Sequence, residues 1–205
     1  MGSGAEGGLS PERLLPYRGG ADDPVGREGG FVAAVAVVMR EAEQAGPECL
    51  LIRRARSARD PWSGHMAFPG GKRDPDDATL LRTAIRETRE ETGIELDRTA
   101  RPLGRLASVA PQTRHLPPLT IVPFVFELLE PVEFRLRVEE VAEALWAPLA
   151  ELRSPENQAT HAFLAGETRR LFPAIEVRGR TVWGLTHRIL EDLLERVSPL
   201  RRHSG

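Results

Sequence analysis

The chain has 205 residues, of which 40% are hydrophobic and 28% are charged. This is the composition of an ordinary globular protein, and it excludes a chain that is disordered throughout. The 28 basic and 30 acidic residues nearly cancel, giving a formal net charge of −2, which argues against a protein that coats nucleic acid. A substrate that carries phosphate is not excluded, because a few local cations or a metal ion can attract it.

The single cysteine and the short apolar runs indicate a location. Cys49 cannot form a disulfide within the chain, and we interpret it as a small buried hydrophobe rather than a nucleophile. The longest apolar stretch, Phe31 to Met39, is too short to span a bilayer. The first residues, MGSGAEGG, lack the hydrophobic segment of a secretory signal. We therefore expect a soluble, cytoplasmic protein with no membrane partner.

The N-terminal third of the chain begins loosely and continues with strands. Residues 1–30 are rich in Gly and Pro, and we expect a flexible segment with one helix-compatible patch at residues 10–17. Phe31–Met39 is dense in β-branched residues and is predicted to be a buried strand. After a turn, Glu48–Arg54 is predicted to be a second strand.

A loop and a helix follow. Residues 60–77 are full of Gly, Pro and Asp and indicate a loop, with a short strand at His65–Phe68. From about Asp77 to Thr92 there is neither Gly nor Pro, so a helix is expected. Its apolar face repeats at helical spacing, and Gly93 is expected to end it. The residues of that face are Leu81, Ala84, Ile85 and Thr88.

The remaining chain alternates irregularly between elements. The expected strands are Leu103–Val109, Leu119–Leu128 and Leu145–Ala147, with a short helix over Val141–Ala144 and an amphipathic helix over Val182–Val197. Successive βαβ units would alternate more regularly, so the order favours an α/β sandwich over a doubly wound sheet. We expect one domain over residues 31–198, followed by a tail over residues 199–205.

Three carboxylates stand out in the central helix. At about 100° per residue, Glu87, Glu90 and Glu91 lie within about 100° of one another. Like charges this close destabilise a bare helix. A hard divalent cation, which prefers oxygen ligands, would compensate them. The alternative is an ordinary solvated acidic face.

The residues just before the helix favour the metal site. Gly70 and Gly71 allow the backbone to pass where a side chain would block it, and they are followed by Lys72, the only lysine in the chain. Lys72 could equally be an exposed loop charge. Several nearby arginines add positive charge, so a metal ion and a phosphate could be held together. These are Arg53, Arg54, Arg56, Arg59 and Arg73.

This combination resembles the Nudix box. The box reads Gly, five residues, Glu, seven residues, Arg-Glu-U-x-Glu-Glu-x-Gly-U, where U is bulky and aliphatic. The matching residues are Gly71, Arg86, Glu87, Glu90, Glu91, Gly93 and Ile94. In this chain Asp77 takes the place of the first Glu, eight residues instead of seven follow it, and Thr88 replaces an aliphatic residue.

The longer spacing resembles that of the coenzyme A pyrophosphatase branch of the family. The spacing of residues 70–87 is similar to the pattern of that branch. The residues that carry this similarity are Gly70, Gly71, Asp74, Asp77, Thr83, Ala84, Arg86 and Glu87. A second pattern of the branch is represented by Leu50, Leu51, Arg54, Ala55, Arg59 and Gly64, although Ile52 replaces a Thr and the gap before Gly64 has four residues. Residues 183–186, Trp-Gly-Leu-Thr, are also similar to that branch.

The resemblance implies a Nudix α/β/α sandwich with a mixed central sheet and a pyrophosphohydrolase that depends on Mg²⁺ or Mn²⁺. The implied metal ligands are Glu87, Glu90, Glu91 and the carbonyl of Gly71. Arg86 would orient the carboxylates. Glu90 is one candidate general base. Glu140 or Glu139 is another, although a charge at the start of a helix would explain either one.

The remaining site candidates are less specific. Arg54, Arg59 and Lys72 are the expected substrate-binding cations. His65 and His115 lie in predicted loops and could donate to phosphate, but the plain loop histidine is the favoured interpretation of each. Trp62 is the preferred stacking residue, whereas Trp146 and Trp183 lie in apolar segments and are expected in the core.

The implied reaction is cleavage of coenzyme A or a derivative into 3′,5′-ADP and a phosphopantetheine. The alternatives are hydrolysis of ADP-ribose or of a nucleoside triphosphate, a nucleotide-sensing module without catalysis, and a simple calcium-binding or acidic interaction helix. The expected partner is a small nucleotide and no nucleic acid. A homodimer fits the family, although no sequence feature demands one.

Overall fold

In the computed structural model, residues 13–24, 30–57, 62–111, 118–165 and 168–196 are described. The helices are α1 (Leu80–Thr92), α2 (Leu96–Thr99), α3 (Leu149–Arg153) and α4 (Gly184–Arg196), with 3₁₀ turns η2 (Gly20–Asp22) and η3 (Pro155–Asn157). The strands are β1 (Phe31–Ala42), β2 (Gly46–Arg54), β3 (Met66–Ala67), β4 (Gly70–Lys72), β5 (Ala100–Arg105), β6 (Leu119–Leu128), β7 (Val141–Pro148), β8 (Gln158–Ala165), β9 (Thr168–Val177) and β10 (Arg180–Trp183).

A mixed seven-stranded sheet forms the centre of the fold. Its main order is β3-β2-β1-β6-β5, with β4 also paired to β1 and β7 to β2. The long β1 and β6 strands run parallel in the register Ala34↔Val122, whereas the other pairs are antiparallel. The predicted α/β class with a mixed central sheet is therefore confirmed.

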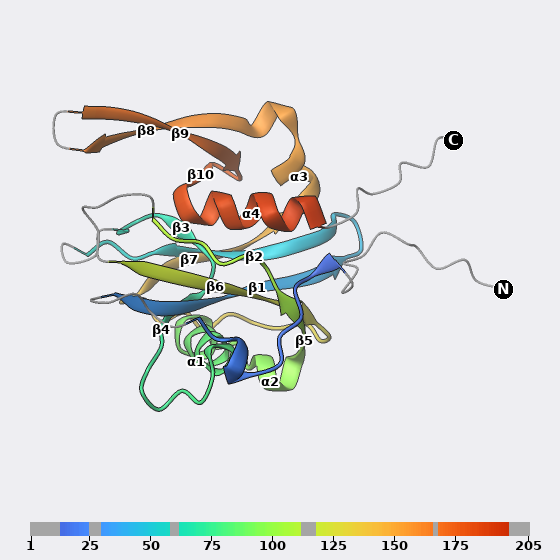
Figure 1. The fold of residues 1–205 in the computed structure, drawn as a ribbon. Coiled ribbons are helices and arrows are strands. Elements are labelled where there is room, and N and C mark those ends of the chain that lie inside the picture. Colours follow the sequence, from blue (N-terminus) through green and yellow to red (C-terminus); the bar gives the residue numbers. More distant parts are fainter. Residues whose placement is uncertain (1–12, 25–29, 58–61, 112–117, 166–167, 197–205) are drawn as a thin grey trace.

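Each face of this sheet buries its own hydrophobic cluster. Figure 1 shows α1 and α2 below the sheet and α4 above it. Ala36, Val38 and Leu50 face the α1 side and pack with Leu80 and Ala84 of α1. On the other face, a second cluster includes Val37 and Leu51 of the sheet and Ile189, Leu190 and Leu193 of α4. Alternate residues of β1 thus point to opposite cores, as the pleat of a strand requires.

Local signals define helix α1 at both ends. Thr79 caps its N-terminus by accepting a hydrogen bond from the Arg82 backbone N–H at 3.2 Å. Gly93 ends it with φ of +77°, a left-handed conformation that glycine adopts without penalty, as predicted. Of the predicted apolar face, Ala84 and Thr88 are buried. Buried Thr88 donates its hydroxyl to the Ala84 carbonyl at 2.7 Å, so it carries no unsatisfied polar group where the Nudix box has an aliphatic residue.

Several predicted elements are corrected by the structure. Val141–Ala144 is not a helix but the first half of β7, whose residues pair with β2. The strand expected over Leu103–Val109 begins at Ala100 and ends at Arg105, while Val109 forms only an isolated bridge with Ile121. The strand expected at His65–Phe68 is the two-residue β3, and the terminal helix is preceded by β10.

Part of the N-terminal segment, expected to be flexible, packs against the domain. Leu14 is buried, and Leu15 forms a bridge with Arg105 of β5. The start of the predicted helix-compatible patch, residues 10–12, lies outside the described residues. The Tyr17 ring meets Phe124 edge-on, with ring centroids 4.8 Å apart. Asp23 accepts a hydrogen bond from the Leu80 backbone N–H at 3.0 Å. Residues 13–24 therefore belong to the packed structure.

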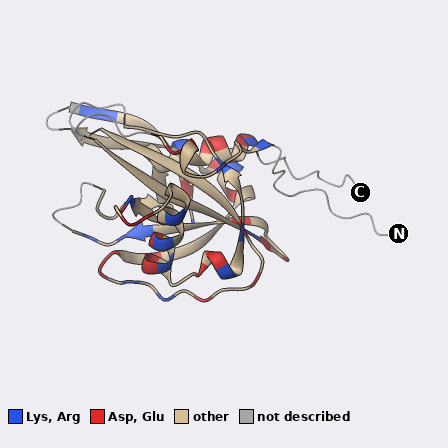
Figure 2. Cartoon of the chain, turned by 60° about the horizontal axis from the view of Figure 1, so that its bottom comes forward, with Lys and Arg blue, Asp and Glu red and all other residues tan. Residues whose placement is uncertain are grey.

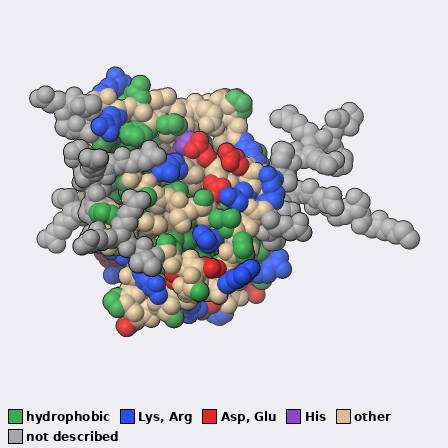
Figure 3. Space-filling view, viewed as in Figure 1, with side chains coloured by type: hydrophobic (Ala, Val, Ile, Leu, Met, Phe, Trp, Pro, Cys, Tyr) green, Lys and Arg blue, Asp and Glu red, His purple; other side chains and the backbone are tan. Residues whose placement is uncertain are grey.

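A second, three-stranded sheet with the order β10-β9-β8 lies beyond α4 (Figure 1), and its β8–β9 hairpin had no counterpart in the sequence analysis. The hairpin exposes Phe163, Leu164 and Leu171, and Figure 3 shows hydrophobic side chains on the surface there. Within the described residues, no helix has the length and apolar character needed to cross a bilayer. The predicted cytoplasmic location stays a prediction.

Candidate active site

The three glutamates of α1 lie at different depths along one side of the helix. Glu91 is buried because it continues the face formed by Ala84 and Thr88. The side chains of Glu87 and Glu90 are 16% and 37% exposed, so they rise stepwise toward the surface. Figure 2 shows charges of both signs interspersed along the described chain.

Arg86 connects the helix to the loop before it. Its Nε and Nη2 donate to the two carboxylate oxygens of Asp77 at 3.1 and 2.9 Å. Nη1 donates to Glu87 at 3.0 Å and to Glu90 at 3.1 Å, and Nη2 also donates to the Lys72 carbonyl. Arg86 therefore forms charge-assisted hydrogen bonds with two of the three glutamates, and its predicted role of orienting them stays a prediction.

The glycine pair brings backbone against the carboxylates. Gly70 donates its N–H to Oε2 of Glu91 at 2.8 Å. Its φ is +151°, and an added Cβ would lie 2.2 Å from the Ala34 carbonyl, so only glycine fits. At Gly71 an added Cβ would lie 2.4 Å from Oε1 of Glu87. Position 70 therefore requires glycine because the β1 backbone closes on it, whereas a side chain at position 71 would have to displace the Glu87 carboxylate.

The cluster is short of positive charge. Burial raises the pKa of Glu91 to about 8, although the Gly70 hydrogen bond and the charge of Arg54 act in the opposite direction. Burial also raises the pKa of Glu87, against the lowering effect of Arg86, and the charges of Glu90 and Glu140 add to the rise. A nearby cation would favour the ionised form of both side chains.

The donor set fits a hard divalent cation, although no cage is preassembled. Among the described residues, no three His, Cys, Asp or Glu side chains converge closely enough to hold a metal ion as they stand. Each glutamate nevertheless uses one carboxylate oxygen in its hydrogen bonds and keeps the other without a hydrogen-bond partner in the described part of the chain. Oxygen ligands of this kind suit Mg²⁺ or Mn²⁺.

Two residues from other elements reach the same cluster. Glu140 precedes β7, and its charge raises the pKa of both Glu87 and Glu91, so it lies near them. Arg54 ends β2, and its charge lowers the pKa of Glu91. The role of Glu139 stays a prediction. The structure thus brings Glu140 and Arg54, from the predicted set, to the acidic helix.

The remaining predicted cations are placed differently. Lys72 is exposed, and its Nζ lies over the Phe31 ring at 3.9 Å from the centroid. Arg59 lies outside the described residues, as does His115. The substrate-binding roles of Arg54, Arg59 and Lys72 stay predictions.

Of the two tryptophans expected in the core, the structure places only Trp146 there. Trp146 is buried in the α1-side core, as predicted, and stacks on Phe134. Trp183 is only half-buried and does not belong to either core cluster. It lies instead among rings from other segments, which are His65, His161, Phe163 and Phe172. Trp62 is half-buried in the loop before Ser63.

Two features of the structure were not predicted from the sequence. One is the pairing of Asp77 with Arg86; the unusual acidic residue in the box was its only signal. The other is a network in which Glu143 of β7 binds Arg53 of β2 and Arg180 of β10. No local pattern marks that network, because its members come from three distant segments.

Comparisons with known proteins agree with this geometry. The NUDIX domain model matches residues 30–166. An uncharacterized protein of Schizosaccharomyces pombe is 43% identical over 115 residues, which are 55% of this chain and 35% of that protein. The human mitochondrial coenzyme A diphosphatase NUDT8 is 35% identical over 156 residues, covering 75% of this chain and 64% of the human protein. The chain thus spans from one third to just under two thirds of the length of these relatives.

The crystal structure of a MutT/nudix family protein from Enterococcus faecalis superposes with a TM-score of 0.55 at 16% identity, covering 86% of this chain and 64% of that one.

Proposed function

Because this chain belongs to the NUDIX family, we propose that it is a pyrophosphohydrolase that depends on a divalent metal ion and acts on a nucleotide. The observation that carries the proposal is the acidic cluster of α1 beneath the glycine pair. A cluster that buries carboxylates at a cost, with one oxygen of each unengaged, is suited to a cation rather than to a purely structural role.

The proposed substrate is coenzyme A or a derivative, cleaved to 3′,5′-ADP and a phosphopantetheine. Two observations support it: the similarity to a coenzyme A diphosphatase over 75% of this chain, and the spacing of residues 70–87, which resembles the coenzyme A branch. A diphosphate linkage carries negative oxygens that repel a nucleophile, so any enzyme acting on it must first offset that charge.

Each residue of the cluster has a distinct part in this proposal. Glu87, Glu90, Glu91 and the Gly71 carbonyl would hold Mg²⁺ or Mn²⁺. When bound, the cation neutralises the diphosphate and lowers the pKa of the attacking water. Arg86 holds Glu87 and Glu90 in place from one side. Glu90 or Glu140 accepts the proton of that water, since both carboxylates are solvent-accessible beside the cluster.

A substrate panel tests the reaction. The protein is incubated with Mg²⁺ and, separately, with coenzyme A, ADP-ribose and a nucleoside triphosphate, and the products are identified by mass spectrometry. We expect 3′,5′-ADP and 4′-phosphopantetheine from coenzyme A. Intact coenzyme A beside cleaved ADP-ribose would overturn the substrate assignment. Nucleotide binding without turnover of any substrate in Mg²⁺ or Mn²⁺ would indicate a sensing module instead.

A pair of variants identifies the proton acceptor. Glu90→Gln and Glu140→Gln each remove one candidate carboxylate with little change in shape, and Glu133→Gln, at an exposed glutamate that was not proposed as a base, is the matched control. We expect the variant that lacks the base to stay folded and to lose about 10²-fold or more in kcat. Unchanged turnover in Glu90→Gln would remove Glu90 from the mechanism.

A further inference from the structure

The β8–β9 hairpin gathers most of the exposed large hydrophobic side chains. Within the described residues five such side chains are exposed, and three of them, Phe163, Leu164 and Leu171, lie on this hairpin. Leu171 is paired with Ala162, so it lies diagonally across from Leu164 on the same face. Single apolar residues scattered over a surface need no explanation, whereas a contiguous group of them marks an interaction site.

Strand β8 forms one edge of the three-stranded sheet. It spans Gln158–Ala165, and among the described residues it pairs only with β9. In an antiparallel pair about half of the backbone N–H and C=O groups of a strand point to its partner, so the other half of those in β8 point outward. The strand contains neither a proline nor a charged residue, which are the usual protection of an edge.

Two other edge strands of the protein are protected in the usual ways. β5 carries Arg101 and Pro102, its register is irregular between Pro102 and Gly104, and Leu15 bridges its last residue. β10, at the opposite edge of the three-stranded sheet, has only four residues and begins with Arg180. Charges, proline, bulges, coverage and shortness all discourage pairing with another chain. Within the described part of the chain, the eight residues of β8 have none of these protections.

Aromatic contacts hold the hairpin in place. The His161 ring stacks on Trp183 of β10 with centroids 4.2 Å apart. The rings of Phe163 and Phe172 lie 5.4 and 5.6 Å from Trp183. Aromatic pairs at such distances contribute about 0.5–1.5 kcal/mol each beyond the burial of their area. The edge is therefore part of an ordered sheet, and a partner strand does not have to order it first.

We propose that β8 pairs antiparallel with β8 of a second copy of this chain, which joins two three-stranded sheets into one sheet of six strands. A two-fold axis perpendicular to the sheet generates such a pair, and it keeps each face of the hairpin on the same side in both copies. The row of Leu164 and Leu171 therefore continues into the same row of the second copy. Phe163 lies on the opposite face, which is continuous in the same way.

The charges of the hairpin are compatible with this arrangement. Arg169 and Arg170 are exposed and lie on β9, away from the free edge. Strands are about 4.8 Å apart, so the two β9 strands of the dimer are separated by three spacings, about 14 Å. This exceeds the Debye length of about 8 Å at physiological ionic strength, and the repulsion between the arginines is screened. A charged peptide, in contrast, finds no opposite charge on β8.

The size of the edge determines how stable the dimer is. The eight residues of β8 extend about 27 Å, and a sheet is about 10 Å thick, so the edge presents a strip of about 270 Å². A standard interface buries roughly 800 Å² per partner, and here only the flanking apolar side chains add to the strip. We therefore expect a dimer that dissociates on dilution rather than a permanent one.

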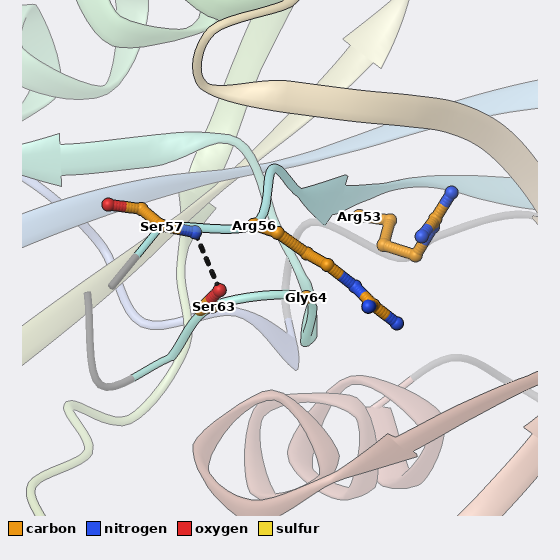
Figure 4. A pocket seen from close by; sticks show the side chains of 5 residues that line it. All are labelled: Arg53, Arg56, Ser57, Ser63 and Gly64. Carbon is orange, nitrogen blue, oxygen red and sulfur yellow. Dashed lines mark hydrogen bonds between the residues drawn. The ribbon is translucent and has the colours of Figure 1, made fainter. Parts of the chain in front are cut away.

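The proposed interface is separate from the acidic cluster and from the cavity at the end of β2. That cavity is lined by Arg53, Arg56, Ser57, Ser63 and Gly64 (Figure 4), none of which lies on the hairpin. The three glutamates lie on α1. The interface therefore goes beyond the proposed function, and the oligomeric state can be measured whether or not the protein hydrolyses coenzyme A.

Two measurements on the full chain test the interface. Analytical ultracentrifugation across the micromolar concentration range should find an equilibrium between monomer and dimer. Hydrogen exchange followed by mass spectrometry should find slower exchange of the amides in residues 158–165 as the concentration rises. At a concentration where nine tenths of the chains are dimeric, the amides bonded only in the dimer should exchange about tenfold more slowly, because they exchange from the monomer.

A double variant tests which surface is used. Ala162→Lys combined with Leu164→Lys sets like charges beside the two-fold axis, and both residues are exposed, so the hairpin should stay folded. We expect the dissociation constant of the dimer to rise about tenfold or more. The matched control combines Leu129→Lys with Val138→Lys, at two exposed apolar residues outside the hairpin, and should keep the wild-type dissociation constant. Circular dichroism establishes that each variant is folded.

Three outcomes would overturn the inference. A wild-type chain that stays monomeric throughout the concentration range rejects a second copy as the occupant of the edge. A dimer that persists unchanged in Ala162→Lys/Leu164→Lys does not use β8. A dimer that forms without slower exchange in residues 158–165 is held by another surface.

Discussion

Asp77 and Arg86 form a bidentate pair, with Nε and Nη2 of the guanidinium 3.1 and 2.9 Å from the two carboxylate oxygens. Asp77 is buried and lies in the loop that precedes α1, whereas Arg86 is in the middle of the helix. The pair fixes the plane of the guanidinium, and that plane decides where the third nitrogen meets Glu87 and Glu90. The loop thereby positions the carboxylates without touching them.

Asp77→Asn should lower turnover by releasing Arg86. We expect a loss of about 1–2 kcal/mol in the free energy of unfolding at pH 7, the value of a charge-assisted hydrogen bond, together with a drop in kcat of tenfold or more. Denaturant unfolding and steady-state kinetics measure the two effects. Asp76→Asn, one residue away and exposed, is the control. Wild-type kcat in Asp77→Asn would show that Arg86 needs no support from the loop.

The same pair predicts an acid dependence of stability. Burial opposes ionisation of Asp77, but the hydrogen bonds from Arg86 and from the Asp74 backbone outweigh it and lower its pKa to about 2. In the unfolded chain this pKa is about 3.9. The contribution of the pair is therefore complete above about pH 4 and is lost as the pH falls toward 2. The stability gap between the wild-type protein and Asp77→Asn should shrink over this range in urea titrations.

Gly71→Ala should disturb the acidic cluster more than the fold. The added Cβ would lie 2.4 Å from Oε1 of Glu87, and the flexible carboxylate can move away where backbone could not. We expect kcat to fall at least tenfold, with a small shift in melting temperature. At Gly20 an added Cβ would meet nothing closer than 3.8 Å, so Gly20→Ala should keep its activity. Full activity in Gly71→Ala would mean that the position of Glu87 does not matter.

Removal of metal should abolish turnover and leave the protein folded. The two apolar clusters on either side of the sheet hold the fold together, so EDTA should not change the far-ultraviolet circular dichroism. Adding Mg²⁺ or Mn²⁺ should raise the melting temperature, because a ligand of the native state stabilises it. This rise should disappear in Glu87→Gln and Glu91→Gln but persist in Glu95→Gln. Undiminished turnover in EDTA would contradict the metal dependence.

Cys49 should be inert while the protein is folded. Its side chain is fully buried, and burial, followed by the charge of Glu48, raises the pKa of the thiol to about 12. A neutral and inaccessible thiol does not react with iodoacetamide. Mass spectrometry should find no label at pH 8 in the native protein and one label after denaturation. Rapid native labelling would contradict both the burial and the interpretation of Cys49 as a structural hydrophobe.

Much of the candidate site was predictable from the spacing of residues along the sequence. The 3.6-residue period of a helix alone places Glu87, Glu90 and Glu91 on one side of it. Gly93 ends that helix by its own local conformation, which does not depend on where the helix packs in the fold. The predicted strand Phe31–Met39, which is dense in β-branched residues, lies within β1. In contrast, Val141–Ala144 became part of β7, because pairing with β2 outweighs a weak local preference for helix.

The sequence by itself determined that a trio of acidic side chains lies along one turn of a helix behind two glycines, since the backbone geometry that sets this arrangement is local. Only the tertiary structure decided how deep each carboxylate lies, and that Arg86 is shared between Asp77, Glu87 and Glu90. It alone brought Arg53 and Glu143, 90 residues apart, into one ion pair. Burial and hydrogen bonds between distant segments depend on the register of strands and the packing of layers, which no single stretch of sequence encodes.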